Sequence, residues 1–443
     1  MNCYSNEKDT LTLVKLLKEH GIHRAVISPG STNISFAASL LYDPDFEVYS
    51  CIDERSAAYM ACGLSAESGD PVVISCTGAT ASRNYVPALT EAYYRKLPII
   101  TVTSSQYFGR VGHLFPQVTD RRDPMKDIVV KSVQIPVSRC QEDEWSNNVK
   151  INDVLLECTR RGGGPVHINI ETTFSKVFDV KELPNVRVIR RITAKDFFPK
   201  INAVRVAIFI GSHQRFDKNL IDAIDSFCEK YNAIVICDHT SNYKGKYRVL
   251  GGIVERQIGY SPTCRNIDLL IHIGEISGAY YKFNVKSVWR VNPDGEVRDT
   301  FRKLHYVFEM NEYSFFEYYN GLEHEGNNTF YQEWKEEEKN LYGALGNLPF
   351  SNAWIAQQTA DKIPARSVIH FGILNSLRMW NLFEIDKSVE GYSNVGGFGI
   401  DGSISTLIGA SLCDPQKLYF LVLGDLATFY DLNSLGNHHI ENN

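Results

Sequence analysis

Small polar residues and glycines follow three predicted strands at short intervals in the first part of the chain. They form the turns at 28–32 (SPGST), 51–58 (CIDERSAA) and 77–84 (TGATASRN). Turns that lead from a strand into a helix expose backbone N–H groups, which bind anions. Each turn alone is explained equally well as a helix cap. Because parallel strands end at one edge of a sheet, the three turns together predict a ligand site at that edge.

A further polar pair, Gly424-Asp425, comes directly after the apolar run 418–423 (LYFLVL). A carboxylate at the end of a buried strand offers the hard oxygen ligand that Mg²⁺ prefers, usually together with phosphate oxygens. A lone Gly-Asp pair is more often an ordinary turn. Magnesium binding and a structural turn are therefore both open interpretations of these two residues.

The elements that must position these turns alternate along the whole chain. Short β-branched runs, as at 72–76 and 99–103, flank segments of helical periodicity such as 82–96. This alternation predicts the α/β class, with doubly wound parallel sheets covered by helices. A polar, basic stretch at about 185–200 predicts a linker. Three consecutive domains are expected, at residues 1–184, 200–310 and 345–443.

Composition excludes several classes of protein. The 443 residues carry a net charge of −6, which argues against a general nucleic-acid binder. The longest apolar runs are far shorter than the ~20 residues of a membrane helix, and the polar start MNCYSNEKDT is unlike a signal peptide. Ten scattered cysteines without a CxxC pair predict buried, reduced thiols and a cytoplasmic protein. No GxGxxG follows the first strand, which counts against a nucleotide-binding or NAD-binding protein.

Five segments in order carry a family resemblance that covers nearly the whole chain. They are SPGS at 28–31, DERSAA at 53–58, CTGATASRNYVPALTEAYY at 76–94, SNVGGFGIDGSIST at 393–406 and GDLATFYDLNSL at 424–435. The chain resembles the thiamine-diphosphate-dependent enzymes, in particular the menaquinone-pathway synthases that join 2-oxoglutarate to isochorismate. The resemblance implies thiamine diphosphate and Mg²⁺ as cofactors. It also implies a pyrimidine-binding domain, a central domain and a diphosphate-binding domain, in that order.

The resemblance implies roles for single residues. Glu54 matches the glutamate that protonates the aminopyrimidine of the cofactor, and Gln117 matches a glutamine that faces the reaction centre. His113 lies in the same loop (GRVGHLFPQ) and is expected near the substrate. Asp425 matches the first magnesium ligand. The expected cofactor-binding residues are Ser31, Gly78, Asn84, Ser376, Gly396, Gly397, Gly399 and Gly424.

Three substitutions separate this chain from the synthases it resembles. Those synthases carry arginines for the carboxylates of their substrates, where this chain has Thr32, Gln106 and Val395. Arginine binds carboxylates bidentately, and none of the three replacements carries its charge. We therefore expect decarboxylation of another, shorter 2-oxo acid, with carboligation or release of the acyl carbanion, and an acceptor other than isochorismate.

The end of the chain suggests a second hypothesis. The family's second side-chain ligand for magnesium, an asparagine, is expected beyond residue 443, and Asn442 and Asn443 are expected to be ordinary polar residues. The last domain is thus expected to be incomplete, and a catalytically inactive homologue or non-catalytic subunit is the alternative. The resemblance further implies a homodimer or homotetramer, with Glu54 and Asp425 supplied by different chains. No nucleic-acid or membrane partner is expected.

Overall fold

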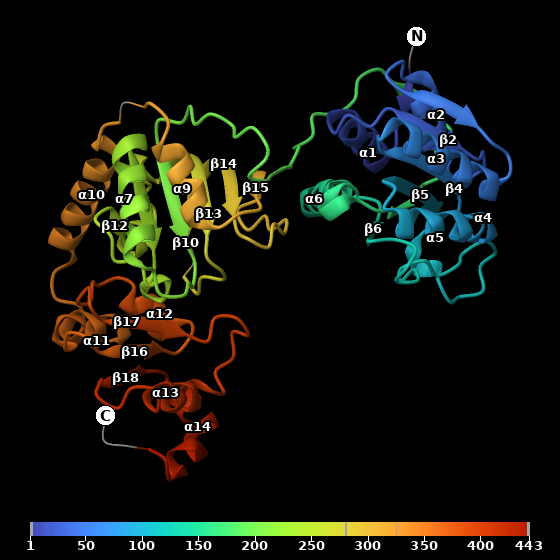
Figure 1. Ribbon diagram of the computed structural model, residues 1–443. Helices are drawn as coiled ribbons and strands as arrows, with labels where there is room; N and C mark the ends of the chain where they lie inside the picture. Colours follow the sequence, from blue (N-terminus) through green and yellow to red (C-terminus); the bar gives the residue numbers. More distant parts are fainter. Residues whose placement is uncertain (1–2, 280, 325, 441–443) are drawn as a thin grey trace. The chain divides into compact units, whose positions relative to one another are not determined.

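The computed structural model describes residues 3–279, 281–324 and 326–440, and it divides into two compact units (Figure 1). The N-terminal unit is Met1–Arg190 and the C-terminal unit is Arg191–Asn443. Each unit is an α/β structure with parallel sheets, which confirms the predicted fold class. None of the helices among these residues has the length and apolar character needed to cross a membrane.

The N-terminal unit is built on a six-stranded parallel sheet with the order β3-β2-β4-β5-β7-β6. The strands are β2 (Arg24–Ile27), β3 (Glu47–Ser50), β4 (Val72–Thr77), β5 (Ile99–Ser105), β6 (Lys131–Ile135) and β7 (Val166–Glu171). The strand order reverses between β2 and β4, since β3 lies on the far side of β2. Ligands of open α/β sheets bind at such a reversal, at the carboxyl ends of the strands. Residues 4–5 and 178–180, which the sequence did not predict as strands, pair as the antiparallel strands β1 (Tyr4–Ser5) and β8 (Phe178–Val180).

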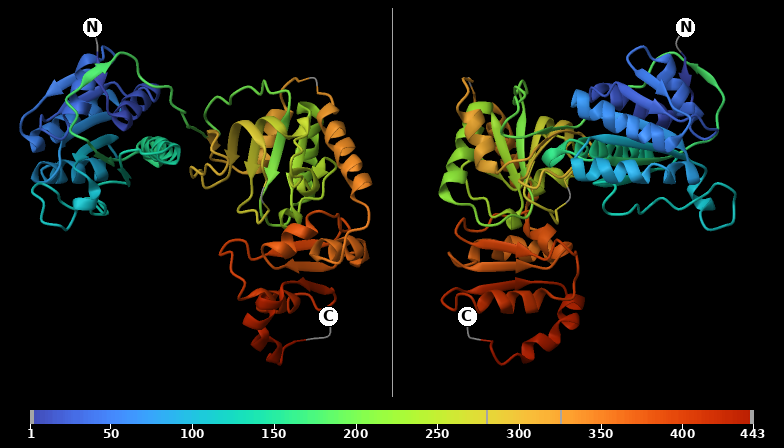
Figure 2. Two further views of the ribbon diagram at one scale, coloured as in Figure 1. Left: turned by 180° about the vertical axis from the view of Figure 1, so that it is seen from behind. Right: turned by 45° about the vertical axis from the view of Figure 1, so that its right-hand side comes forward.

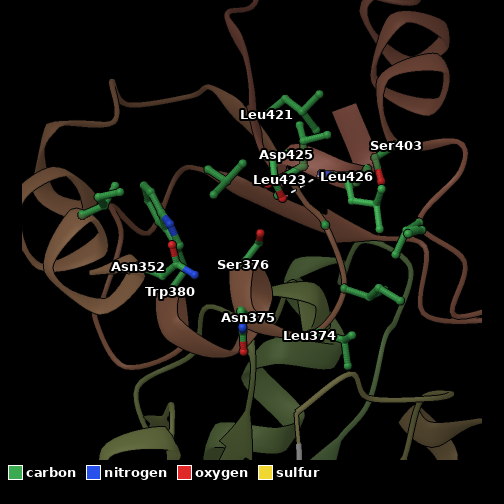
Figure 3. Close-up of a pocket in the computed structure, with 17 residues that line it drawn as sticks. Asn352, Leu374, Asn375, Ser376, Trp380, Ser403, Leu421, Leu423, Asp425 and Leu426 are labelled. Carbon is green, nitrogen blue, oxygen red and sulfur yellow. Dashed lines mark hydrogen bonds between the residues drawn. The ribbon is translucent and has the colours of Figure 1, made fainter. Parts of the chain in front are cut away.

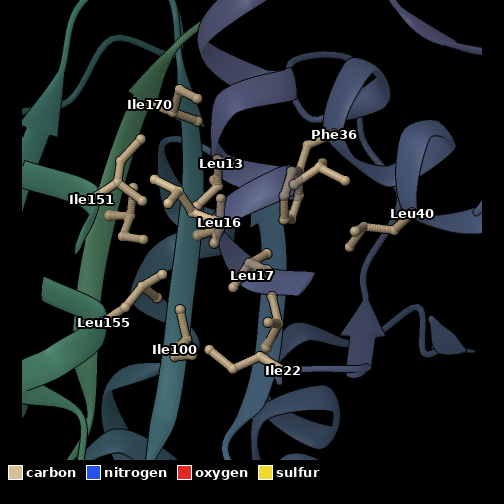
Figure 4. Packing of buried hydrophobic residues seen from close by; sticks show 14 of the residues in the cluster. Leu13, Leu16, Leu17, Ile22, Phe36, Leu40, Ile100, Ile151, Leu155 and Ile170 are labelled. Carbon is tan, nitrogen blue, oxygen red and sulfur yellow. The ribbon is translucent and has the colours of Figure 1, made fainter. Parts of the chain in front are cut away.

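Helices cover both faces of this sheet. One face packs on α1 (Lys8–Glu19), α2 (Ile34–Tyr42) and α6 (Gln141–Glu157), through the branched and aromatic side chains drawn in Figure 4. The other face packs on α3 (Glu54–Ser68) and α5 (Val86–Arg95), where small residues such as Ala57 and Ala61 let α3 approach closely. The single helix expected at 82–96 is instead two, α4 (Thr80–Arg83) and α5. Pro87 in the first turn of α5 explains the break, because proline lacks the N–H that would continue the first helix.

The C-terminal unit contains a seven-stranded sheet with the order β12-β11-β10-β13-β14-β15-β9. The strands are β9 (Arg190–Ile192), β10 (Val206–Ile210), β11 (Ala233–Cys237), β12 (Arg248–Val249), β13 (Asn266–Ile273), β14 (Asn284–Val291) and β15 (Leu304–Phe308). Helices α7 (Lys218–Tyr231) and α9 (Glu312–Asn320) share one hydrophobic core with this sheet, and α10 (Thr329–Leu345) follows. The expectation of a linker throughout 185–200 is wrong at β9, where the Ile192 carbonyl accepts a hydrogen bond from Glu309 N.

The same unit holds a three-stranded parallel sheet with the order β17-β16-β18. Its strands are β16 (Val368–Phe371), β17 (Glu390–Ser393) and β18 (Tyr419–Val422). Helices α11 (Asn352–Thr359) and α12 (Asn375–Trp380) lie on one side of it and α13 (Ser403–Ser411) on the other (Figure 2). The short helix α14 (Asp425–Tyr430) begins after β18. The proposed domain limits at 1–184, 200–310 and 345–443 stay a prediction.

Candidate functional site

The predicted residues of the N-terminal unit lie in the loops at the carboxyl edge of its sheet. Ser31 follows β2, Glu54 follows β3, Gly78 and Asn84 follow β4, and Gln117 lies in the long loop after β5. The strands are parallel neighbours, so these loops share one edge of the sheet. The sequence-based prediction of a ligand site concerns this same edge.

Glu54 and Asn84 are brought into direct contact. Asp53 caps α3, since its side chain accepts a hydrogen bond from Ser56 N at 2.8 Å, and Glu54 is the first residue of the helix. Asn84 Nδ2 donates to Glu54 Oε2 at 3.2 Å. The Glu54 side chain is half-buried, so one carboxylate oxygen is fixed by protein while the group stays accessible. The first turn of a helix also favours a negative charge.

The guanidinium of Arg121 packs closely against Gly78. A Cβ at this position would lie 2.7 Å from Arg121 Nη1. Arg121 is buried, and its guanidinium donates to Asn169 Oδ1 at 3.0 Å and to Thr119 Oγ1 at 2.9 Å. The turn after β4 therefore has a buried positive charge beneath it. The sequence did not single out Arg121, since nothing in the local pattern marks it as buried.

The other predicted residues of this unit are more exposed. Ser31, His113 and Gln117 all have exposed side chains, and Gln117 adopts a left-handed backbone with φ of 61°. Within the described part of the chain, neither His113 nor Gln117 is hydrogen-bonded to Glu54. Their assignment to the reaction centre stays a prediction.

The residues that stand in place of the expected arginines all serve the fold. Thr32 is 3% exposed, shares a hydrogen bond with the Thr77 hydroxyl and donates to the Ser104 carbonyl at 3.1 Å. Val395 is buried in the apolar cluster of the last sheet. Gln106 Oε1 accepts from Arg110 Nη1 at 2.8 Å.

Figure 3 shows the cavity in the C-terminal unit, of about 510 Å³, at the carboxyl ends of β16 and β18. Three predicted residues, Ser376, Gly424 and Asp425, line it together. The Ser376 hydroxyl points toward the segment that carries Asp425, whereas the labelled Asn375 amide points away from it. A hydroxyl and a carboxylate thus share a hollow at a sheet edge, next to the start of α14.

Asp425 is the acidic group of this cavity. Its Oδ1 accepts from Leu426 N at 2.8 Å, and its side chain is exposed. Across residues 3–279, 281–324 and 326–440, no group of three or more His, Cys, Asp or Glu side chains is placed to hold a metal ion. Mg²⁺ commonly takes one or two carboxylates and completes its shell with substrate phosphates and water. A carboxylate and a hydroxyl around a hollow of this size fit a magnesium diphosphate. Asn442 and Asn443 lie outside the described residues.

Three of the glycines expected at the cofactor lie beside this cavity rather than in its wall, whereas Gly424 lines it. Gly396, Gly397 and Gly399 are in the loop between β17 and α13. Ile400 of this loop and Ser403, the first residue of α13, line the cavity. Added Cβ atoms at Gly396, Gly397 and Gly424 would meet nothing within 4 Å. An added Cβ at Gly399 would instead lie 2.5 Å from Asp401 Oδ1, so the open space in this loop is at Gly396 and Gly397.

Trp380 and Asn352 are among the residues lining the cavity that sequence reasoning missed. Trp380 stands four residues after Ser376 in α12, so helical periodicity places both side chains on one face. That signal was available in the segment NSLRMW. Asn352 comes from α11, which is separated from β16 in sequence, and no local pattern points to it.

Comparison with known proteins identifies the family of the chain. Residues 10–125 match the family described as "Thiamine pyrophosphate enzyme, N-terminal TPP binding domain". The 2-succinyl-5-enolpyruvyl-6-hydroxy-3-cyclohexene-1-carboxylate synthase of Bacteroides fragilis is 31% identical over 472 residues, which cover 99% of this chain and 82% of that protein. The synthase of the same name from Bacteroides thetaiotaomicron is 31% identical over 467 residues, with the same coverage. That of Phocaeicola vulgatus is 30% identical and covers 98% of this chain and 81% of its own length. The chain therefore belongs to the thiamine pyrophosphate enzymes, the family whose cofactors are thiamine diphosphate and Mg²⁺.

Proposed function

We propose that this protein decarboxylates a short 2-oxo acid with thiamine diphosphate and transfers or releases the acyl group, and that its acceptor is not isochorismate. The observation that supports this is the buried Thr32, whose hydroxyl is shared with Thr77 and Ser104. A residue held in this way offers no charge to a substrate carboxylate. Substrates with several carboxylates lose a major source of binding energy as a result.

The residues present fit the cofactor in two places. Ser376 and Asp425 would hold the magnesium diphosphate, and Glu54 would hold the aminopyrimidine. When bound, thiamine diphosphate supplies the carbon nucleophile that adds to a 2-oxo group. Asn84 orients one oxygen of Glu54, which leaves the other free to exchange a proton with a ring nitrogen.

The loop that carries His113 and Gln117 also carries Arg110. Arg110 is half-buried, donates to Gln106 and lies over the Phe115 ring at 4.9 Å. The Arg110 guanidinium is held in place by Gln106 and by the Phe115 ring. It could bind a single carboxylate of a substrate. This supports a monocarboxylic 2-oxo acid such as pyruvate in preference to the dicarboxylic 2-oxoglutarate.

Calorimetry of the 443-residue chain with thiamine diphosphate and Mg²⁺ tests the cofactor site. We expect saturable binding that Asp425→Asn weakens at least about tenfold, because a charge-assisted ligand is lost. Asp414→Asn removes a partly exposed carboxylate that does not line the cavity and should leave binding unchanged. Absence of binding by the unaltered chain would favour the non-catalytic alternative.

Carbon dioxide release from a panel of 2-oxo acids tests the substrate class. We expect faster release from pyruvate than from 2-oxoglutarate, and no stimulation by isochorismate. Robust turnover of 2-oxoglutarate with isochorismate would contradict the proposal, even if the cofactor binds as expected.

A further inference from the structure

A second cavity in the C-terminal unit is strongly basic. It encloses about 630 Å³ between the end of α8 (Gly252–Glu255), the loop that follows it, and α12. Four cationic side chains line it, against a single carboxylate. These are Arg256, Arg265, Lys282 and Arg378, with Glu255 as the acid. Cofactor binding in the diphosphate cavity does not use any of them.

The one carboxylate that lines the cavity, Glu255, is bonded to other residues of the cavity wall. The Glu255 side chain is fully buried, and its Oε2 accepts from Lys282 N at 2.6 Å. Its Oε1 lies 3.2 Å from Arg265 Nε, while Arg265 Nη2 donates to the Lys282 carbonyl at 2.7 Å. Glu255 thus offsets Arg265 alone, and the cavity keeps an excess of positive charge.

Arg256 is the cation without a counter-charge. It is half-buried, and within the described ranges it has no ion pair or hydrogen bond from its side chain. Burial and the nearby charge of Arg378 both lower the pKa of Arg256. Two guanidinium groups facing one partly buried space are destabilising unless an anion lies between them. Among the described residues that line the cavity, Glu255 is the one carboxylate, and it is held by Arg265 and the Lys282 backbone.

Helix α12 separates this basic cavity from the diphosphate cavity. Ser376 and Trp380 line the diphosphate cavity, and Arg378 lines the basic one. Residues two apart in a helix lie roughly 200° around its axis, so the two sets project from opposite faces. The two cavities are therefore separate sites that share one short helix.

We propose that the basic cavity binds a phosphate dianion, as free phosphate or as the phosphate of a small organic monoester, between Arg256 and Arg378. Planar guanidinium forks match phosphate oxygens bidentately. The cavity exceeds the size of one phosphate, and Ile258 and Tyr260 on its wall are exposed apolar surface that an organic group would cover.

Calorimetric titration of the full chain with inorganic phosphate and, separately, with ribose 5-phosphate tests the site. Both should bind, and Arg256→Gln should weaken binding about tenfold, as expected for the loss of a charge-assisted contact. Lys286→Ala removes one exposed positive charge from the same unit and should not change the affinity. Circular dichroism of Arg256→Gln checks that it folds, and Arg256→Lys should recover part of the affinity.

Ser376→Ala separates the two cavities, because Ser376 belongs only to the diphosphate site. Loss of phosphate binding in Ser376→Ala but not in Arg256→Gln would overturn the proposal. So would equal binding by the unaltered chain and Arg256→Gln. Tighter binding of ribose 5-phosphate identifies a monoester as the source of the dianion, and equal affinity identifies free phosphate. The readout needs no thiamine diphosphate, so it is independent of the proposed reaction.

Discussion

The position of the Glu54 carboxylate is set by two neighbouring residues. Its backbone is set by the Asp53 cap of α3, and one of its oxygens is set by the Asn84 amide. A carboxylate held at one oxygen and accessible at the other is suited to proton exchange with a bound base. Glu54 is the residue of the N-terminal unit whose geometry most directly supports the proposed chemistry.

Glu54→Gln should keep the size and the hydrogen bond of this side chain but remove its ability to exchange a proton. We expect hydrogen–deuterium exchange at the thiazolium carbon of bound thiamine diphosphate to slow by roughly 10²–10⁴-fold, with little change in cofactor affinity. Proton NMR of the quenched cofactor measures this rate. Glu67→Gln, an exposed glutamate on the same helix, is the matched control. Unchanged exchange in Glu54→Gln would refute the assigned role.

At the scale of elements, α12 depends on one buried side chain. Leu377 is fully buried in the apolar cluster of the last sheet. The backbone at Gly278 approaches it so closely that an added Cβ there would lie 2.5 Å from Leu377 Cδ2. Leu377 therefore anchors the helix that carries Ser376 on one face and Arg378 on the other.

Leu377→Ala should lower the free energy of unfolding by about 2–5 kcal/mol, from lost apolar burial and the cavity left behind. Because Ser376 then loses its fixed position, thiamine diphosphate affinity should fall as well. Urea unfolding followed by circular dichroism gives the first quantity and calorimetry the second. Leu412→Ala, at a half-exposed leucine of the same unit, should change stability by no more than about 0.5 kcal/mol. Equal effects of the two substitutions would contradict the anchoring role.

The sequence predicts elements well where apolar runs are long and bounded by turns. The short β-branched runs noted at 72–76 and 99–103 lie within β4 (Val72–Thr77) and β5 (Ile99–Ser105), and the residues expected on one sheet edge do follow neighbouring parallel strands. Strands of two or three residues, such as β9, have too few positions to show a period of two. The partners of Thr32 and Gly78 depend on loops brought together by the sheet, and no local pattern contains that information.

At the scale of the whole molecule, the family resemblance predicts an active site shared by two chains. If Glu54 and Asp425 come from different subunits, a dimer of Glu54→Gln with Asp425→Asn contains one intact site and one doubly altered site. After unfolding and refolding an equal mixture, we expect about a quarter of the unaltered activity, because half of the dimers are mixed and each has one working site. Each variant alone should be inactive. A mixture no more active than its components would argue against shared sites.

Stability should also depend on pH, through several buried histidines. Burial, with the charges of Arg121 and Arg83, lowers the pKa of His167 to about 3. Burial, with the Arg248 charge, lowers the pKa of His239 to about 3, and burial lowers that of His370 to about 4. These imidazoles stay neutral in the folded protein but take up protons in the unfolded chain below about pH 6.5. Their contribution to stability is therefore complete above that pH. It is lost as the pH falls toward the pKa values of these histidines in the folded protein.

The contribution of His213 to stability changes with pH in the opposite direction, because its pKa is raised. Burial lowers its pKa, but the hydrogen bond and charge of Glu312 outweigh that effect and raise it. Its contribution is present at low pH and is lost as the pH rises through the folded value. The pKa is lowered for three of these histidines and raised for one. Urea unfolding at pH 7.5, 6.5 and 5.5 should therefore show the free energy of unfolding falling below about pH 6.5. His370→Gln should flatten this dependence, and the exposed His438→Gln should not. A flat profile for the unaltered chain would contradict the prediction.

The Thr32–Thr77 hydrogen bond has a consequence for how substrate range can change along a lineage or in the laboratory. An arginine introduced at position 32 alone would place a guanidinium in a space that is 3% exposed and leave the Thr77 hydroxyl without its partner. A variant of that kind loses stability before it gains a new substrate. Acquiring a carboxylate-binding arginine here therefore calls for a further change that accommodates the Thr77 hydroxyl.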